Sequence, residues 1–441
     1  MRPPLAPTTA PMSDPSSYLL SLSVENIRCF GPEQTLSLER EDGSPAMWTV
    51  LLGENGVGKT TLLQLIAGAV VSEDYIDLTR DGDEEPDFIY PSRFVNELDS
   101  WIKTQVRVGT TQSRVSAHFS GNTTNTRVED GLIRFTEPHE YPIGYVVGYS
   151  ASRSLAGSHL TTNPLTDSTK SLFEHAPLTN AEEWYLRQHL AAREPGDHQP
   201  EAQRRLDQVR ELLTSTLLPD VEDLRIAGLG GVRAQPYIEV KTVYGWSPMR
   251  ELSLGYKALI AWVVDLAARM IERYPDSEDP LAEPAIVLVD EIDLHLHPTW
   301  QRQLVGYLRK RFPKVQFIVT AHSPLVVQAA QDANVVLLRR EGDHVVIDNN
   351  FDHVSRWRAD QILTSDLFGL PSTAPPEHDA LFEEREELLG KPTLTDEEKQ
   401  RIEEIDAILD ETPSGRTPEE SEAMRLIMHA AAQLRAAGGE P

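Results

Sequence analysis

Residues suited to phosphate chemistry occur at three places along the chain, and the first is the segment GENGVGKTT at 53–61. It follows a short apolar run at 48–52 and precedes a helix-like run, the setting in which this pattern binds nucleotides. Gly53, Gly56 and Gly58 permit a tight turn that points several backbone N–H groups and a helix N-terminus at one anion. The segment therefore predicts a phosphate-binding loop.

Two side chains of this loop have distinct expected roles. Lys59 would reach the β- and γ-phosphates and take part in catalysis, and the Thr60 hydroxyl would hold Mg²⁺. The residues expected to contact the nucleotide are Gly53, Glu54, Asn55, Gly56, Val57, Gly58, Lys59, Thr60 and Thr61.

The second place is an acidic pair at the end of an apolar strand. The run AIVLV at 285–289 is followed directly by Asp290 and Glu291. Because ligands of open α/β sheets bind at the carboxyl ends of the strands, Asp290 is expected beside the loop phosphates as part of the Mg²⁺ shell. Glu291 is expected to position or deprotonate the attacking water.

The third place is His322, in FIVTAHSPLVV. It follows an apolar strand and precedes Ser323 and Pro324, both common at helix starts. An imidazole at that end of the sheet is expected to reach the γ-phosphate and to report its presence.

A metal set of Asp293, His295 and His297 is the alternative use of the neighbouring segment DLHLHP. Histidines at i and i+2 point the same way only on an extended segment, and no cysteine completes a zinc site. We therefore interpret 293–298 as a loop that leads into a helix begun by Pro298.

The elements around these residues predict an α/β fold, a P-loop NTPase with a mostly parallel central sheet, an antiparallel β layer, a helical insertion and a C-terminal helical region. Alternating side chains around a Gly-Pro break indicate an antiparallel hairpin at 19–38. Unbroken apolar strands that alternate with helices indicate a parallel sheet covered on both faces. The strands are expected at 48–52, 285–290, 315–321 and 334–340, and the helices at 256–273, 299–311 and 324–331.

The chain divides by composition into four parts. Residues 1–18, rich in Pro, Ser and Thr, are expected to be a disordered tail. The ATPase core is expected at 19–75 and 250–350, and an inserted β layer with a short helical arm at 76–249. The remainder, 351–441, reads as an acidic helical region.

Composition narrows the class of protein. The formal net charge of -28 argues against a surface that binds along nucleic acid, because such a surface needs clustered Lys and Arg. Any DNA binding would therefore be indirect. No apolar run reaches the length that a membrane helix needs, which predicts a soluble protein without a membrane partner. With Cys29 as the single cysteine no intramolecular disulfide can form, which fits the cytoplasm.

The order of four motifs resembles the ABC-type ATPase heads, and among them the RecF-like and OLD-like bacterial ATPases. These motifs are the phosphate loop, LSLGYK at 252–257, VLVDEIDLHLHP at 287–298 and TAHSP at 320–324. In that family two heads sandwich two ATP molecules, and the signature segment of one head closes over the γ-phosphate held by the other. The resemblance thus implies a homodimer, possible higher oligomers, and ATP and Mg²⁺ as ligands.

The resemblance also assigns expected roles to residues outside the core motifs. Ser253 and Gly255 would contact ATP in trans, with Ser253 capping its helix. Arg28 would approach the adenine or the α-phosphate; a plain surface arginine is the equal alternative. The segment YVVGYSASRS stands where transporters place a glutamine loop, and with no Gln there, Tyr149 and Arg153 are the substitutes.

In LSLGYK, Leu254 occupies the first of two adjacent glycine positions of the transporter signature, so the segment departs from the transporter pattern. Within the bacterial branch, ADQILTSDLFGL at 359–370 and the acidic helices after it look similar to the ATPase subunits of Septu-type and retron-associated anti-phage defence systems. Those ATPases work beside a separately encoded HNH nuclease. OLD-type nucleases carry a nuclease domain after the ATPase, but after 345 this sequence has acidic helices and few candidate strands.

The leading hypothesis is an ATPase that dimerises around ATP and regulates a partner effector, an HNH nuclease in antiviral defence. The alternatives are a nucleotide-gated scaffold with little turnover and a RecF-like DNA repair ATPase, whose DNA affinity would be salt-sensitive. A transporter cassette fits least.

Overall fold

The computed structural model describes residues 18–69 and 106–409, the second range with gaps of which the longest are 137–144, 154–167 and 229–235. The tail expected at 1–18, apart from Tyr18, lies outside the described residues, and so do parts of the expected insertion and of the acidic region. The chain forms two compact units, residues 1–362 and 363–441.

The first unit is built on a six-stranded sheet in the order β14-β13-β3-β12-β11-β7. Its strands pair in parallel except β14, which runs antiparallel to β13. β3, β11 and β12 have almost no exposed side chain, because helices and loops cover both faces. The strands are β3 (Trp48–Gly53), β7 (Val146–Tyr149), β11 (Ala285–Val289), β12 (Val315–Thr320), β13 (Asn334–Glu341) and β14 (His344–Phe351).

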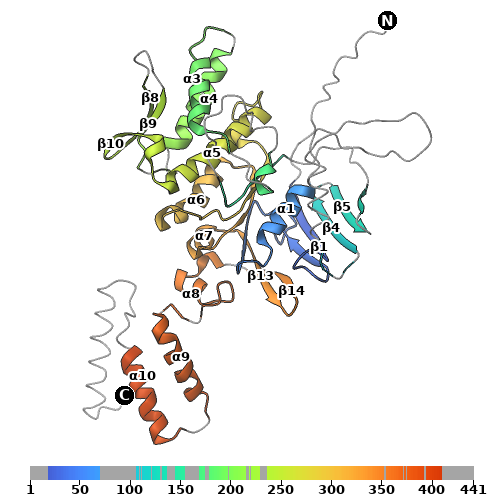
Figure 1. Cartoon of the computed structure of the whole chain (residues 1–441), viewed down its shortest axis with the longest axis vertical. Helices are drawn as coiled ribbons and strands as arrows, with labels where there is room; N and C mark the ends of the chain where they lie inside the picture. The colour runs from blue at the N-terminus through green and yellow to red at the C-terminus, as the bar shows by residue number, and fades with distance from the viewer. Residues whose placement is uncertain are drawn as a thin grey trace, which may run out of the picture. The chain divides into compact units, whose positions relative to one another are not determined.

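The helix α1 (Lys59–Ala69) lies between this sheet and a second, antiparallel sheet of five strands (Figure 1). One buried cluster joins Leu22 of β1 to Leu62 and Ile66 of α1 and to Ile318 of β12. The five strands, in sheet order, are β2 (Gln34–Ser37), β1 (Leu19–Glu25), β4 (Gln112–Phe119), β5 (Asn122–Glu129) and β6 (Leu132–Thr136). The predicted hairpin at 19–38 is therefore confirmed as β1 and β2.

The predicted α/β alternation is also confirmed, with ends that shift by a few residues. Its helices are α5 (Leu254–Arg273), α6 (Pro298–Arg311) and α7 (Pro324–Ala329). The segment expected as an insertion contributes strands to both sheets, because β4 extends the antiparallel sheet and β7 forms the edge of the central sheet beside β11.

A helical arm and a small sheet complete the first unit. The arm is the pair α3 (Ala181–Ala191) and α4 (Gln199–Thr214), and the sheet has the strand order β10-β9-β8. The strands are β8 (Asp223–Ala227), β9 (Tyr237–Thr242) and β10 (Gly245–Pro248). The sequence pattern predicted the helices of the arm, but these three short strands were not predicted.

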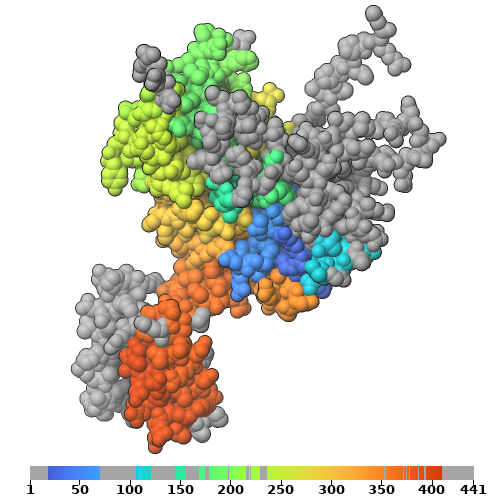
Figure 2. Space-filling view, viewed as in Figure 1, coloured from blue at the N-terminus to red at the C-terminus, as the bar shows by residue number. Residues whose placement is uncertain are grey.

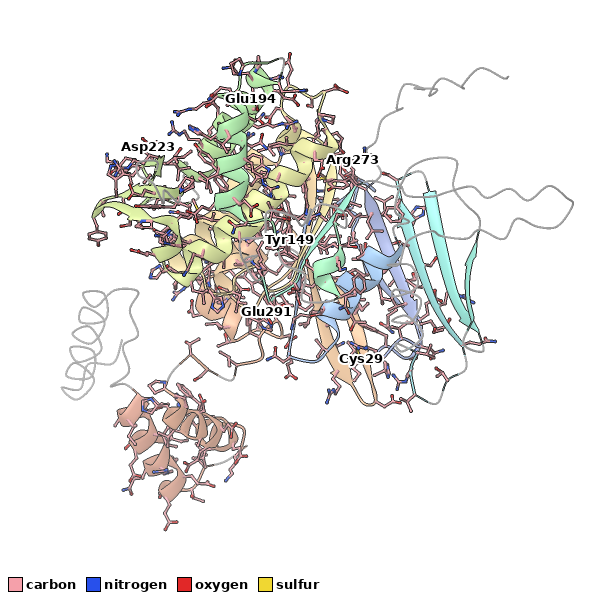
Figure 3. All side chains as sticks on the ribbon, turned by 45° about the horizontal axis from the view of Figure 1, so that its top comes forward. Cys29, Tyr149, Glu194, Asp223, Arg273 and Glu291 are labelled. Carbon is pink, nitrogen blue, oxygen red and sulfur yellow. The ribbon has the colours of Figure 1, made fainter. Side chains whose placement is uncertain are left out.

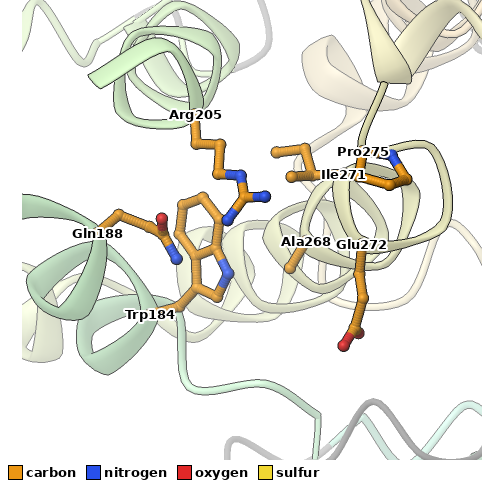
Figure 4. Close-up of a pocket in the computed structure, with 7 residues that line it drawn as sticks. All are labelled: Trp184, Gln188, Arg205, Ala268, Ile271, Glu272 and Pro275. Atoms are coloured by element: carbon orange, nitrogen blue, oxygen red, sulfur yellow. The ribbon is translucent and has the colours of Figure 1, made fainter. Parts of the chain in front are cut away.

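α3, α4 and α5 leave a cavity of about 290 Å³ between them (Figure 4). Its lining residues are Trp184, Gln188, Arg205, Ala268, Ile271, Glu272 and Pro275. Although α5 is 20 residues long, neither it nor any other described helix is apolar and long enough to cross a membrane.

All side chains of α5 from Leu259 to Ile271 are buried. Two of them are charged. Asp265 accepts hydrogen bonds from the Tyr149 hydroxyl (2.9 Å), the Thr179 backbone N–H (2.8 Å) and Arg269 Nε (2.7 Å). A buried carboxylate is tolerated because these donors replace water. The network joins α5 to the edge strand β7.

The second unit contains a helical hairpin of α9 (Pro376–Leu389) and α10 (Asp396–Leu409). Ion pairs join the two helices: Arg401 Nε lies 2.8 Å from Glu384 Oε1, and Arg385 Nε lies 2.6 Å from Asp406 Oδ1. Figure 2 shows the atoms of α9 and α10, in orange and red, packed side by side. α8 (Ala359–Leu363) precedes it in the chain. Among the described residues, the short 3-10 helices are η2 (Lys170–Leu172), η3 (Met249–Glu251), η4 (Pro280–Ala282) and η5 (Val354–Arg356).

We expect Asp265→Ala to lower the free energy of unfolding by about 3–5 kcal/mol, because it leaves Arg269 as a buried charge without its carboxylate. The control is Glu222→Ala, which removes a half-exposed ion pair with Lys241 and should change it by less than about 1 kcal/mol. Urea unfolding of the three proteins measures both. Equal effects of the two variants would contradict the role given to the Asp265 network.

Candidate nucleotide-binding site

The predicted phosphate loop lies between β3 and α1. Gly53, Gly56 and Gly58 have φ angles of 136°, 82° and 93°, which side chains rarely allow. A Cβ atom at Gly53 would lie 2.3 Å from the Leu338 carbonyl oxygen, and one at Gly58 would lie 2.6 Å from Cys29 Sγ. Backbone conformation therefore favours glycine at all three positions, and close neighbours also require it at Gly53 and Gly58.

Lys59 is buried at the base of this loop, with 7% of its surface exposed. Its Nζ donates to the carbonyl oxygens of Gly53 (2.6 Å) and Glu54 (2.9 Å). Burial lowers the pKa of Lys59 below its ordinary 10.5, while nearby carboxylates, first that of Asp290, act in the opposite direction. The loop thus holds an ammonium group where an anion would bind.

Asp290 joins the loop to the acidic strand end. Its Oδ2 accepts a hydrogen bond of 2.7 Å from the Thr60 hydroxyl, and its Oδ1 accepts one of 2.7 Å from Thr320 Oγ1. The same Thr320 oxygen accepts the Glu291 backbone N–H at 2.7 Å. The two residues predicted as Mg²⁺ ligands, Thr60 and Asp290, are therefore in direct contact.

Glu291 adopts a left-handed backbone conformation with φ of 49°. Non-glycine residues are uncommon there, and such strain gathers at functional sites. Glu291 lines a cavity of about 450 Å³, and among the described residues its carboxylate has no hydrogen-bond partner. A carboxylate in this position can accept a proton from a water molecule in the cavity.

This cavity, which we call the loop cavity, gathers most of the predicted site. It is lined by Arg28, Cys29, Asn55, Gly56, Gly58, Lys59, Thr60, Thr61, Asp290, Glu291 and His322. Of the predicted loop residues, Val57 instead packs into the core with 2% of its surface exposed, and Gly53 and Glu54 contribute the carbonyl oxygens bound by Lys59.

Arg28 and His322 come from segments far apart in the sequence, and both line the loop cavity. Arg28 Nη1 lies 3.4 Å from Thr61 Oγ1, so the side chain predicted to approach the nucleotide contacts the phosphate loop. His322 is exposed, and its backbone N–H donates to Asp293 Oδ2 at 2.9 Å.

His297 Nδ1 accepts the Thr299 N–H at 3.3 Å, which makes it the N-cap of α6.

The predicted signature residues Ser253 and Gly255 do not line the loop cavity of their own chain. Ser253 is at the N-cap position of α5, but its exposed side chain makes no capping hydrogen bond, so the expected cap is absent. Gly255 is buried, and a Cβ atom there would lie 2.5 Å from the His295 carbonyl oxygen. Leu254 between them is 59% exposed.

The two residues considered as substitutes for a loop glutamine have different positions. Tyr149 was wrongly placed at the site: its side chain is fully buried and its hydroxyl donates to Asp265, away from the phosphate loop. Arg153 reaches the site and donates to the backbone carbonyls of Asp290 and Glu291. Tyr149 and Glu291 are labelled in Figure 3.

Two residues of the site were missed in the sequence. Thr320 lay inside the quoted motif TAHSP, where a hydroxyl at the end of a strand neighbouring the acidic pair was the available signal. Cys29 had none, because its contact with Gly58 depends on the packing of the hairpin turn on the phosphate loop. Burial raises the pKa of the Cys29 thiol, which keeps it protonated.

The residues present fit Mg²⁺ and a nucleoside triphosphate. Thr60 and Asp290 offer the hard oxygen atoms that Mg²⁺ prefers, and they already lie 2.7 Å apart. Lys59 and the glycine turn offer cationic and N–H donors for phosphate oxygens. The sheet order and the phosphate loop at this edge define the class of fold: the chain has an α/β P-loop fold, with a site whose residues suit a nucleoside triphosphate.

Comparisons with known proteins agree with that class. The model of the family described as AAA domain matches residues 21–158, and that of AAA domain, putative AbiEii toxin, Type IV TA system matches residues 159–328. The chain is similar to the Septu protein PtuA of Bacillus mycoides, with 29% identity over 370 residues, 82% of this chain and 46% of that protein. It is also similar to the Retron Ec83 probable ATPase of Escherichia coli, with 46% identity over 89 residues, 20% of this chain and 16% of that protein.

The chain thus spans about half the length of the Bacillus relative. Among solved structures, an SmcHead bound to the C-winged helix domain of ScpA matches with a TM-score of 0.44 and 14% identity, over 75% of this chain and 96% of that chain.

We expect Gly255→Ala to lower the free energy of unfolding by about 1–3 kcal/mol, because the added Cβ meets the backbone of His295. Gly306→Ala in α6 is the matched control, since a Cβ there meets nothing within 4 Å. It should stabilise by up to about 1 kcal/mol, the ordinary gain for alanine in a helix. Thermal or urea unfolding compares the two; equal effects would contradict a close contact at Gly255.

Proposed function

We propose that the chain is an Mg²⁺-dependent ATPase that dimerises around ATP and uses hydrolysis to control a separately encoded effector. One observation carries the proposal: the loop cavity contains the phosphate loop, the acidic pair and His322, but not Ser253 or Gly255. A second copy that supplies these two residues would complete the site from outside.

The signature segment supports completion from a second copy. The Ser253 hydroxyl is exposed and makes no hydrogen bond to its own helix, so it is available to a phosphate oxygen. The N-terminus of α5 adds the positive end of a helix 20 residues long. Ser253 and Leu254 at this end of α5 are exposed, whereas Gly255 packs the first turn of the helix against the loop at His295.

Within the loop cavity, each side chain has a separate task. Lys59 would leave its backbone acceptors and bind phosphate oxygens, while the glycine turn supplies N–H donors. Thr60 and Asp290 would hold Mg²⁺, which when bound neutralises phosphate charge. Arg28 would contact the α-phosphate or the adenine from the other side of the loop.

Hydrolysis would depend on Glu291 and His322. Glu291 lines the loop cavity, and its carboxylate, which has no hydrogen-bond partner among the described residues, would take a proton from the attacking water. His322 is fixed through its backbone by Asp293, which leaves its imidazole to contact the γ-phosphate. The position of that backbone is set by the same loop that packs on Gly255.

We further propose that the regulated effector is an HNH nuclease in defence against phage. The similarity to Septu and retron ATPases supports this choice. Nuclease action would then reside in the partner, and the ATPase would gate it through opening and closing of the dimer.

We expect Glu291→Gln to reduce phosphate release by about 10²–10⁴-fold, because the amide keeps the shape of the side chain but cannot accept the proton. The dissociation constant for ATP should change by less than about twofold, since Glu291 acts on water and not on the ground state. Turnover is measured by phosphate release and affinity by a fluorescent ATP analogue.

Glu211→Gln, an exposed change on α4 far from the phosphate loop in the sequence, is the control and should behave as wild type. Unchanged turnover of Glu291→Gln would contradict hydrolysis at this site and favour a scaffold that binds nucleotide with little turnover.

The effector is tested with a neighbouring gene that encodes an HNH protein. We expect the two proteins to elute together in size-exclusion chromatography, and Glu291→Gln to alter cleavage of DNA by the complex. Failure of the pair to associate with and without ATP would contradict the nuclease partner and leave the ATPase alone.

A further inference from the structure

Arg153 follows the edge strand β7, which pairs in parallel with the acidic strand β11. Its Nη2 donates to two consecutive backbone carbonyls, those of Asp290 at 2.6 Å and Glu291 at 2.5 Å. Its Nε donates to the carbonyl of Ser150 at 3.2 Å, which fixes the base of the side chain to its own turn. The guanidinium group therefore binds backbone of the acidic pair.

The two carbonyls matter because of the conformation between them. Glu291 has φ of 49°, and a single non-glycine residue in the left-handed region costs about 1–2 kcal/mol. The backbone N–H of Glu291 donates to Thr320 Oγ1 at 2.7 Å, and the backbone carbonyl of Glu291 accepts a hydrogen bond from Arg153. Both sides of this one residue are thus fixed by hydrogen bonds, which is how a strained conformation persists.

Arg153 is also placed to keep its charge and its orientation. Burial lowers the pKa of Arg153 to about 10, and the carboxylates of Asp290, Asp293 and Glu291 act in the opposite direction. It remains charged near neutral pH. Its Cζ lies 5.9 Å from the centre of the Trp262 ring on α5. A planar guanidinium can hydrogen-bond the carbonyls while its face is turned toward that ring.

The same side chain lies beside the first turn of α5. Arg153, Leu254, Lys257 and His295 line one cavity of about 290 Å³, separate from the loop cavity. His295 also has a positive φ of 64°, and its carbonyl meets Gly255. Arg153 therefore stands between the acidic pair and the signature end of α5.

We infer that Arg153 is a positioning residue for ATP hydrolysis: it holds the Glu291 peptide in its left-handed conformation, so that the carboxylate faces the loop cavity. The inference rests on the proposed role of Glu291 in that hydrolysis. Unlike a glutamine that reaches a metal ion, Arg153 acts through the main chain of the acidic pair.

The test uses Arg153→Ala in the full chain. Without the clamp, Glu291 relaxes toward an ordinary conformation and its carboxylate turns from the water, so kcat should fall by about 10²-fold. The KM and dissociation constant for ATP should stay within about twofold, because the phosphate loop is not touched. Ethylguanidinium added to Arg153→Ala should restore a measurable part of kcat, and should restore nothing in Glu291→Gln.

Arg311→Ala is the matched control. Arg311 is similarly enclosed, with 18% of its side chain exposed and an ion pair with Asp279 at 3.1 Å, but it is remote from the acidic pair in the fold. Its kcat should equal that of wild type.

Arg153→Lys keeps a cation but lacks the Nε–H that fixes the side chain to the Ser150 carbonyl, so it should bind ATP normally and recover less kcat than Arg153→Ala with ethylguanidinium. If Arg153→Ala does not fold, Arg153→Lys alone decides the inference by the split between kcat and ATP affinity.

Wild-type kcat in Arg153→Ala, or a parallel loss of ATP binding and turnover without rescue, would overturn the inference. These results are distinct from failure of the proposed function, which appears as wild-type turnover in Glu291→Gln. If Glu291→Gln is inactive and Arg153→Ala is fully active, the role of Arg153 is contradicted and the proposed role of Glu291 is not.

Discussion

The two hydrogen bonds accepted by Asp290 connect the parts of the site that lie far apart in the sequence. One comes from Thr60, at the start of α1, and the other from Thr320, at the end of β12. They require β3, β12 and β11 to end at one edge, which the sheet order with β12 between β3 and β11 provides. Thr320 then extends the chain of bonds to the Glu291 N–H. The phosphate loop, the two predicted Mg²⁺ ligands and Glu291 are thereby fixed together.

A second set of contacts links this edge to α5. Arg153 holds the carbonyls of the acidic pair, and Asp265 of α5 accepts the Tyr149 hydroxyl from the same edge strand, β7. The His295 carbonyl approaches Gly255 so closely that a Cβ atom has no room. A change at Glu291 therefore has short, packed routes to the segment proposed to complete the site of a second copy, since close-packed interiors transmit displacement.

Much of the fold and most of the phosphate site could be predicted from the sequence, because they rest on local patterns. The apolar runs before Asp290 and His322 predict a buried strand in each case, and they also predict that the polar residue lies at the end of that strand. What failed depended on tertiary contacts. The short strands β8, β9 and β10 lack a distinctive pattern, and Tyr149 turned inward because a buried Asp265 lay opposite it. Likewise Ser253 occupies the cap position but makes no capping bond, a matter of side-chain rotation that spacing does not determine.

The central claim is that each hydrolysis site is shared between two copies, and mixing two defective chains tests it most directly. Glu291→Gln lacks the base, and Ser253→Arg places a bulky cation where the signature would meet phosphate. Each alone should be nearly inactive. A mixed dimer pairs the intact loop of the Ser253→Arg chain with the intact signature of the Glu291→Gln chain, so an equimolar mixture should recover about a quarter of wild-type phosphate release. A mixture no more active than its two components, or full activity of Ser253→Arg alone, would contradict a shared site.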